Sequence, residues 1–287
     1  MKKSLSGGAD TLMLDALREF SLSVGNFRHI QTLAYEITGI SLSDHKHNMI
    51  YSRLARRLRA LNLKSFDEYC ALLDAGDAQE VHEFVNAITT NLTAFFRESH
   101  HFEFLRTSVL PSIVKKKGES RRIRIWSAGC STGEEPYSLA MVIKSFPALK
   151  SWDVKILATD LDSNVIATAK TGIYSLDRAA KIADEHKKYF LYDKASQRIK
   201  VKDAICDLIT FKQLNLLHDW PMKGTFDVIF CRNVVIYFDA KTQRQLFDRY
   251  ANILNEDGYL FIGHSENLHN ISDRFTGLGR TVYQRSR

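Results

Sequence analysis

The chain has 287 residues, of which 45% are hydrophobic and 25% charged, which is ordinary for a soluble globular protein with one large and one smaller domain. No apolar run approaches the roughly 20 residues that a membrane span needs, so we expect no membrane insertion. The net charge of +7 indicates an acidic partner, which nucleic acid, anionic lipid or an acidic protein surface would each provide.

Neither the start of the chain nor its cysteines indicate export. Met1-Lys2-Lys3 is basic, but Asp10 and Asp15 interrupt the stretch that follows, so we expect no signal peptide. The four cysteines are far apart in sequence and form no CxxC pair: Cys70, Cys130, Cys206 and Cys231. This spacing predicts neither a disulfide framework nor a metal site, and it fits reduced thiols in a cytoplasmic protein.

The first 95 residues predict an all-helical domain. Asn26 and Gly39 are placed to begin and end its first helix, and Ser65 with Glu68 three residues later forms a capping box for its third. Caps and apolar positions at helical spacing together predict helices over about residues 27–38, 44–61, 66–75 and 80–90. We expect residues 96–120 to form a linker helix.

From about residue 121 to 287, predicted strands and helices alternate, which is typical of an α/β domain with a doubly wound, mostly parallel sheet. Strands are predicted over residues 123–126, 154–159, 226–231, 258–262 and 281–284, and helices over 135–146, from 163, and after a capping Asp239. The stretch from about 190 to 213 breaks the alternation. Residues 199–202 and 208–211 predict short antiparallel strands there, so we expect a small β insertion.

The first predicted strand runs into a glycine loop and then a helix. Ligands of doubly wound sheets bind beyond the carboxyl ends of the strands, and Gly129 and Gly133 let the backbone approach a ligand, although two such glycines are equally typical of a plain turn. The second strand ends at Asp160. An acid there accepts both hydroxyls of a ribose, or else Asp160 or Asp162 only caps the next helix. Loop and acid together favour a nucleoside ligand.

The glycine loop does not predict a phosphate site. It lacks the lysine and hydroxyl pair of a P-loop, and Glu134 and Glu135 would repel phosphates. Acidic residues suit a ligand with cationic groups, such as the ammonium and sulfonium of S-adenosylmethionine. Glu134 would pair with that ammonium or with a ribose hydroxyl, or it would only stabilise the first turn of its helix through the helix dipole.

Four segments resemble motifs of the chemotaxis receptor glutamate methyltransferases (the CheR type). They are residues 91–98 (NLTAFFRE), 127–138 (SAGCSTGEEPYS), 226–238 (FDVIFCRNVVIYF) and 263–267 (GHSEN). Four motifs in the right order make the resemblance specific, and it covers nearly the whole chain. It implies a helical substrate-recognition domain over residues 1–95 and a Rossmann-like class I methyltransferase domain over 121–287 that binds S-adenosylmethionine.

The resemblance also implies the reaction and its residues. S-adenosylmethionine would give a methyl group to a glutamate side chain on the cytoplasmic methylation helices of a chemoreceptor, which leaves S-adenosylhomocysteine and a methyl ester. The cofactor-binding residues that it implies are Asn91, Thr93, Arg97, Glu134, Asp160, Asn215, Leu216, Arg232 and Asn233. Tyr237 is implied on the same wall, near the transferred methyl.

This chemistry needs orientation more than acid or base. A glutamate with a pKa of ~4.3 is ionised at pH 7 without a general base, and orienting two reactants is worth up to ~7–11 kcal/mol. We expect Arg97 and Tyr237 to be the catalytic residues. Arg97 would hold the carboxylate of either the acceptor or the cofactor. Tyr237 would border the line of methyl transfer, or would only be a packed residue.

A basic helix indicates where the acceptor docks. From Lys46 to Lys64 the chain has six Lys or Arg and no acid. Helical spacing places Arg53, Arg56 and Arg59 opposite the apolar stripe, with Arg57 flanking them. Such a face is usually only solvated, but the missing acids favour an anionic partner. The predicted substrate-binding residues are Arg53, Arg56, Arg57 and Arg59.

The loop of the β insertion bears on a second docking contact. Family members that dock on a receptor's tail peptide have a glycine in this loop, whereas residues 192–198 here contain none. We therefore expect no tethering by a tail peptide, and we expect a monomer.

Three other functions are less favoured. A nucleic-acid methyltransferase fits the positive charge, but residues 232–235 (RNVV) lack the Asn/Asp-Pro-Pro-aromatic motif of enzymes that methylate base amines, so we expect no nucleic-acid partner. A non-catalytic receptor- or nucleotide-binding module would not need the full set of site residues. A nicotinamide dehydrogenase would need GxGxxG spacing in the loop.

Overall fold

A computed structural model describes residues 18–180 and 182–286, so the basic start of the chain lies outside the described residues. The chain divides into two compact units, Met1–Thr89 and Thr90–Arg287. Within the described ranges, no helix has both the length and the apolar content to cross a membrane.

The described part of the first unit is helical, with four α-helices as predicted. Its elements are α2 (Val24–Thr38), the 3-10 turn η1 (Asp44–Lys46), α3 (His47–Ala60), α4 (Phe66–Asp74) and α5 (Ala78–Ile88). Ser65 caps α4 as expected, since its Oγ accepts from the Glu68 N–H at 3.2 Å. The cap of α2 is Ser23 rather than Asn26, because the Ser23 hydroxyl accepts from the Asn26 N–H at 3.0 Å.

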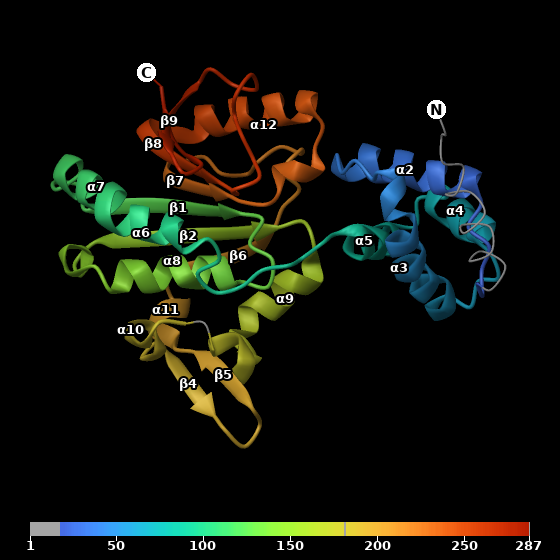
Figure 1. The fold of residues 1–287 in the computed structure, drawn as a ribbon, viewed down its shortest axis with the longest axis horizontal. Helices are drawn as coiled ribbons and strands as arrows, with labels where there is room; N and C mark the ends of the chain where they lie inside the picture. The colour runs from blue at the N-terminus through green and yellow to red at the C-terminus, as the bar shows by residue number, and fades with distance from the viewer. Residues whose placement is uncertain (1–17, 181, 287) are drawn as a thin grey trace, which may run out of the picture. The chain divides into compact units, whose positions relative to one another are not determined.

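The second unit is built on a seven-stranded sheet with the order β6-β2-β1-β7-β8-β10-β9 (Figure 1). The strands are β1 (Arg122–Ala128), β2 (Asp153–Asp160), β6 (Ile209–Gln213), β7 (Phe226–Cys231), β8 (Leu254–Ile262), β9 (Phe275–Gly279) and β10 (Val282–Arg285). The strands from β6 to β8 in this order run parallel, and β10 pairs antiparallel with both β8 and β9. The predicted doubly wound, mostly parallel sheet is confirmed.

Helices cover both faces of this sheet. The main ones are α8 (Glu134–Lys144) after β1, α9 (Ser163–Thr171) after β2 and α12 (Ala240–Ile253) after β7, and the short 3-10 turns η3 (Pro147–Leu149) and η5 (Val235–Tyr237) lie between them. Side chains of β1 alternate between the faces. Ile123 and Ile125 share a core with α8, whereas Trp126 shares one with Tyr250 of α12.

The segment expected as a linker helix is part of the second unit. It forms α6 (Ser99–Phe104), the π-helical stretch η2 (Leu105–Val109) and α7 (Leu110–Lys116). Its apolar side chains are buried in the same core as α8, among them Phe102, Leu105, Leu110 and Ile113. These residues therefore stabilise the sheet domain as well as connecting to it.

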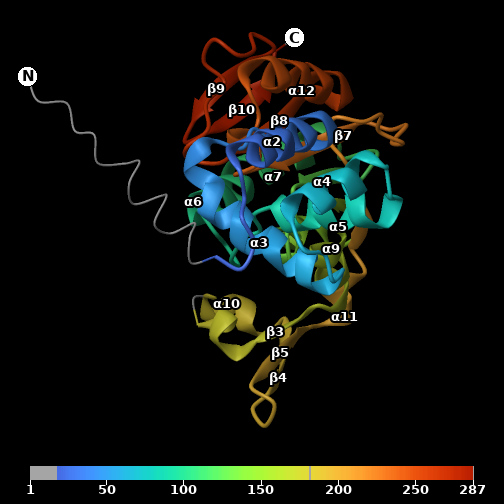
Figure 2. The ribbon, with the colours of Figure 1, turned by 90° about the vertical axis from the view of Figure 1, so that its right-hand side faces the viewer.

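The small antiparallel sheet differs from the prediction in its members. Its order is β3 (Ile173–Ser175), β5 (Arg198–Val201) and β4 (Phe190–Asp193), with η4 (Leu176–Ala179), α10 (Asp184–Lys187) and α11 (Asp203–Cys206) beside these strands in sequence. The β4–β5 hairpin, in yellow, extends away from the large sheet in both views (Figure 1, Figure 2). Assigning residues 208–211 to this sheet was wrong, because β6 pairs in parallel with β2. A short run of alternating residues does not reveal which strand it will join.

The turn between β4 and β5 closes without glycine. Asp193 accepts the backbone N–H groups of Ala195 and Ser196 at 3.0 and 3.1 Å, and Gln197 takes a left-handed φ of 53° that glycine more often adopts. The hairpin thus forms without a glycine, and Gln197 adopts the left-handed conformation in its turn.

Candidate active site

Three strands of the large sheet end together at the point where the strand order reverses. Within the sheet, β2 is the neighbour of β1 on one side and β7 is its neighbour on the other. The segments that follow their carboxyl ends (residues 129–133, 160–162 and 232–237) therefore converge where open α/β sheets bind ligands. The first loop is fastened to the second strand, because the N–H groups of Gly129 and Cys130 donate to the Thr159 carbonyl at 2.8 and 2.9 Å.

Both loop glycines are needed for close approach. Gly129 has a φ of 111°, and a Cβ added to it would lie 2.3 Å from Cγ2 of Val234. Gly133 has a φ of 98°, and its Cβ would lie 2.9 Å from both Cβ of Ala169 and the hydroxyl of Tyr174. The loop is thus more than a plain turn, since it packs directly on the segment after β7 and on α9.

Asp160 lies beneath this loop at the end of β2. Its Oδ2 accepts the Ser131 N–H at 2.8 Å, and its Oδ1 accepts the Asp162 N–H at 3.0 Å. Burial raises the pKa of Asp160 to about 6. The helix cap is instead Asp162, whose Oδ1 accepts the Asn164 N–H at 2.8 Å. A carboxylate offers about four lone-pair directions, so Asp160 keeps acceptor capacity for ribose hydroxyls.

The segment 91–98 is bonded to the same loop. The Asn91 amide donates to Asp162 Oδ2 at 2.7 Å, and the Ser131 hydroxyl donates to the Asn91 carbonyl at 2.9 Å. The Phe96 N–H donates to the Ser138 hydroxyl on α8 at 3.0 Å. The structure therefore places Asn91 against the glycine loop and Asp162, which are far from it in sequence.

The segment after β6 completes this side of the site. The Leu214 N–H donates to the Asp160 carbonyl at 2.9 Å, which places Asn215 and Leu216 beside the end of β2. The Asn215 Oδ1 accepts the Leu217 N–H at 3.0 Å, and Leu216 is 8% exposed within the core that α12 shares. The Asn215 side chain is therefore fixed by a turn, and Leu216 is packed in the core.

Glu134 has a partner that the sequence did not indicate. It is fully buried, and its Oε1 accepts from Nη1 of Arg178 at 2.5 Å while its Oε2 accepts from the Thr132 hydroxyl at 2.6 Å. The same Arg178 nitrogen contacts the Thr93 carbonyl at 3.3 Å. Glu134 is thus neutralised by the protein itself, and Arg178 of η4 contacts both predicted residues, Thr93 and Glu134.

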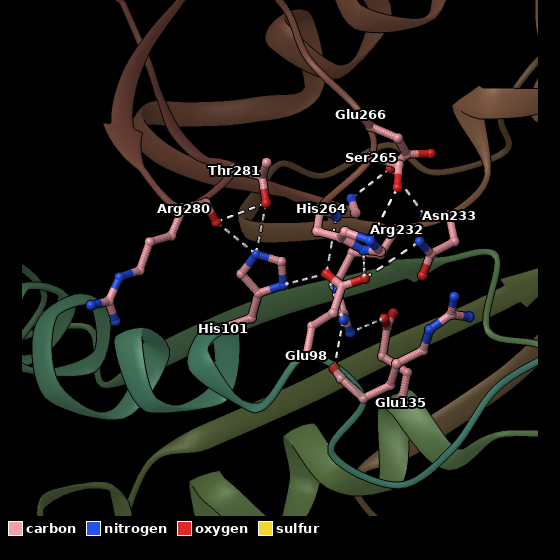
Figure 3. A network of polar contacts seen from close by, with 12 residues as sticks. Glu98, His101, Glu135, Arg232, Asn233, His264, Ser265, Glu266, Arg280 and Thr281 are labelled. Carbon is pink, nitrogen blue, oxygen red and sulfur yellow. Dashed lines mark hydrogen bonds and ion pairs between the residues drawn. The ribbon is translucent and has the colours of Figure 1, made fainter.

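Arg232 is the centre of a buried ion cluster. Its guanidinium lies 3.1 Å from Glu98 Oε2, donates to Glu135 Oε2 at 3.0 Å and donates to the Arg97 carbonyl at 2.5 Å (Figure 3). Ser127 donates to the other Glu135 oxygen at 2.7 Å. The side chains of Arg232, Glu98 and Glu135 are 2%, 10% and 10% exposed. Arg232 and Glu135 are therefore buried residues that hold the segment 91–98 and the end of β1 in place.

Histidines surround the Glu98 end of this cluster. Burial would raise the pKa of Glu98, but the charge of Arg232 and a hydrogen bond with His264 lower it to about 2. Burial and Arg232 lower the pKa of His101 to about 4, and its Nε2 donates to the Arg280 carbonyl at 2.9 Å. Glu98, His100 and His101 offer ligand atoms within 4.8 Å of one another. Because Arg232 already neutralises Glu98, we assign this group a structural role.

The two predicted catalytic residues lie on the segments just described. The Arg97 guanidinium is partly buried and donates to the Leu92 carbonyl at 2.6 Å, which folds it back on its own segment. Tyr237 is partly buried at the end of η5, and its N–H donates to the Val234 carbonyl at 3.2 Å. Asn233 has a left-handed φ of 59°, and its amide lies 3.4 Å from Glu98 Oε1.

The basic face of α3 is less free than its sequence indicated. Arg57 pairs with Glu80 and Glu83 at 2.5 and 3.5 Å, and Arg59 pairs with Glu19 at 2.8 Å. Arg53 donates to the carbonyls of Ala87 and Thr89 at 3.1 and 2.5 Å, at the end of α5. The inference that these arginines lack acids was therefore wrong for Arg57 and Arg59, whose acids come from distant parts of the sequence. Arg56 is exposed.

Comparisons with known proteins match both units. Residues 91–284 match the family described as "CheR methyltransferase, SAM binding domain", and residues 25–89 match "CheR methyltransferase, all-alpha domain". A chemotaxis protein methyltransferase of Salmonella typhimurium is 40% identical over 100% of this chain and 99% of its own. Chemotaxis protein methyltransferase 2 of Pseudomonas aeruginosa is 43% identical over 93% of this chain and 95% of its own.

Proposed function

Because the chain belongs to the CheR methyltransferase family and its cofactor is S-adenosylmethionine, we propose that it methylates glutamate side chains of chemoreceptors. The acceptors are the cytoplasmic methylation helices of methyl-accepting chemotaxis proteins, the products are γ-glutamyl methyl esters, and the enzyme acts as a monomer in the cytoplasm. The full-length similarity to chemotaxis protein methyltransferases carries this proposal.

The residues at the strand ends fit the cofactor. Asp160 keeps lone pairs for the ribose hydroxyls, and Asn215 with Leu216 lies next to it for the adenine. Gly129 leaves room for close backbone approach. Asn91 is bonded to the loop through Ser131, and Asn233 lies on the segment after β7, which packs on Gly129. The loop carries no lysine or arginine that would select a phosphate instead.

The protein's own part in the reaction is to orient two reactants. When bound, S-adenosylmethionine supplies a methyl group on a sulfonium, which an acceptor carboxylate takes up as S-adenosylhomocysteine leaves. The acceptor is already ionised at pH 7, so no side chain has to remove a proton. Arg97 has guanidinium donors beyond the one on Leu92 with which to hold a carboxylate, and Tyr237, at the end of η5, would border the line of methyl transfer.

A methylation assay tests the reaction and the acceptor together. Protein would be incubated with methyl-labelled cofactor and either receptor-containing membranes or nucleic acid. We expect base-labile label in the receptor band, as an ester requires, and none in nucleic acid. Label in nucleic acid, or an unlabelled receptor, would contradict the proposal.

Cofactor binding is tested separately. Asp160→Ala removes the acceptor of the ribose hydroxyls, so the calorimetric affinity for S-adenosylhomocysteine should fall by about tenfold or more. Asp153→Ala is the matched control, because Asp153 begins the same strand at its other end, where its exposed side chain pairs with Arg124. An unaltered affinity of the Asp160 variant would remove this residue from the site.

A further inference from the structure

The motif at residues 263–267 contains a buried carboxylate to which the proposed function gives no role. Glu266 follows β8 and is 5% exposed. Four backbone N–H groups donate to it: those of Val234 and Ile236 reach Oε1 at 2.9 and 3.2 Å, and those of Asn233 and Gly263 reach Oε2 at 3.0 and 2.5 Å. All four lone-pair directions of the carboxylate are therefore used.

Three of these donors belong to the segment that follows β7. Backbone N–H groups that converge in this way form a concavity that binds anions, and here the occupant is a side chain of the same protein. Figure 3 shows Glu266 beside Asn233. Asn233 needs such support, because a left-handed φ of 59° is uncommon for a residue with a side chain and persists where its surroundings fix it.

The neighbouring glycine serves the same contact. A Cβ on Gly263 would lie 2.5 Å from the Asn233 amide nitrogen and 2.9 Å from its backbone nitrogen. Gly263 thus leaves room for the segment after β7, and Glu266 binds the backbone of that segment. That segment carries the Asn233 side chain, packs Val234 onto the loop glycine Gly129, and ends at Tyr237.

We propose that Glu266 is a positioning residue for methyl transfer, whose carboxylate fixes the segment 233–236 and through it the Asn233 side chain at the cofactor. The inference rests on the proposed function, but its test includes cofactor binding, which needs no acceptor. Glu266 has no contact with the reacting atoms in this scheme, so its effect passes through Asn233 and the backbone.

The decisive variant is Glu266→Gln. Glutamine has one oxygen, and its NH2 group would face backbone donors, so at least two of the four N–H groups lose their acceptor. The segment then shifts while the fold is kept. We expect the Kd of S-adenosylhomocysteine to rise by about tenfold and kcat to fall by roughly 100-fold, because a misplacement of about 1 Å costs that much, with the KM for receptor unchanged.

A matched control separates positioning from stability. Asp227 is an equally buried carboxylate, 4% exposed in β7, that accepts the Arg124 N–H at 2.8 Å and the Asn255 amide at 2.7 Å and also pairs with Lys117. Asp227→Asn should lower the thermal midpoint as Glu266→Gln does, yet leave the Kd and kcat of the folded protein within about twofold. If Glu266→Gln lowers only the thermal midpoint and leaves Kd and kcat unchanged, Glu266 has no positioning role.

A double variant tests the route through Asn233. If Glu266 acts through this side chain, Glu266→Gln adds little to the loss that Asn233→Ala already causes in kcat and in cofactor affinity. Losses that multiply in full would overturn the proposed route. If the wild-type protein binds S-adenosylhomocysteine but does not methylate receptor, the proposed function is contradicted. The positioning role of Glu266 would still be decided by the effect of Glu266→Gln on the Kd.

Discussion

Arg59 in the first unit and Arg232 in the second both pair with glutamates, but the two ion pairs differ in burial. On α3 in the first unit, Arg59 pairs with Glu19 while their side chains stay 55% and 51% exposed. In the second unit, Arg232 pairs with Glu98 and Glu135, and all three side chains are at most 10% exposed. In both regions the acids come from far along the chain. Burial therefore decides which pairs matter, since an exposed pair contributes about 0–1 kcal/mol and a broken buried pair costs about 3–5 kcal/mol.

The largest effect should come from breaking the buried cluster. Arg232→Met leaves Glu98 and Glu135 without their cation, so the free energy of unfolding in urea should fall by about 3–5 kcal/mol. Arg59→Met is the exposed counterpart and should cost less than about 1 kcal/mol. Similar losses in both variants would mean that burial does not distinguish these two regions.

The second largest effect should appear at the ion pair between Arg178 of η4 and Glu134, the first residue of α8. Arg178→Ala leaves the fully buried Glu134 carboxylate with only the Thr132 hydroxyl, and it frees the Thr93 carbonyl. Losing a hydrogen bond to a charged group costs about 1.5–3 kcal/mol, so the Kd of S-adenosylhomocysteine should rise by about tenfold or more.

The control for Arg178 is an arginine of similar exposure in the same unit whose acidic partner is exposed rather than buried. Arg106 pairs with Glu103, and their side chains are 51% and 56% exposed. Arg106→Ala should leave calorimetric cofactor affinity unchanged, whereas Arg178→Lys should restore part of it because the charge beside Glu134 remains. An affinity of Arg178→Ala equal to that of Arg106→Ala would show that Glu134 needs no internal partner.

A smaller effect should follow pH through Asp160. Burial raises its pKa to about 6, so the free protein takes up a proton as pH falls through that value. Ribose hydroxyls donate best to the ionised form, and replacing a charged acceptor by a neutral one costs about 1 kcal/mol, so cofactor affinity should fall about fivefold between pH 7 and pH 5. Binding near pH 6 should therefore release protons, measured by calorimetry in buffers of different ionisation enthalpy. Asp160→Asn should abolish the release; persistence would assign it to another group.

Much of the fold could be predicted because its signals are local. The cap at Ser65, the strand at residues 226–231 and the glycines of the loop act within a few residues, and the structure has them where the sequence indicated. The membership of β6 could not be read in this way, since the parallel partner of a short strand is chosen by tertiary packing.

The residues of the candidate site also differ in whether local sequence signals could predict them. The motif 91–98 indicated Asn91, the end of the second strand indicated Asp160, and the resemblance implied Asn215; the structure brings the segments of all three together. Glu98 and Glu266 lie inside the quoted motifs, but both contact Asn233. Asn233 comes 135 positions after Glu98 and 33 positions before Glu266, so the spacing within a motif does not reveal these contacts. Arg178 carried no signal at all, because its partner Glu134 belongs to another element.

The smallest effect should be on receptor docking through α3. Reversing Arg53 together with Arg56 would mix two effects, because Arg53 also donates to the carbonyls at the end of α5 and its loss destabilises the first unit. Arg56→Glu alone should raise the KM for receptor about two- to fivefold at low salt, as an exposed charge contact of ~1 kcal/mol or less predicts, with kcat and cofactor affinity unchanged. The difference should shrink as salt screens the charges. Arg28→Glu, an exposed charge on α2, is the control. Equal effects of both reversals would show that net charge, rather than the α3 face, attracts the receptor.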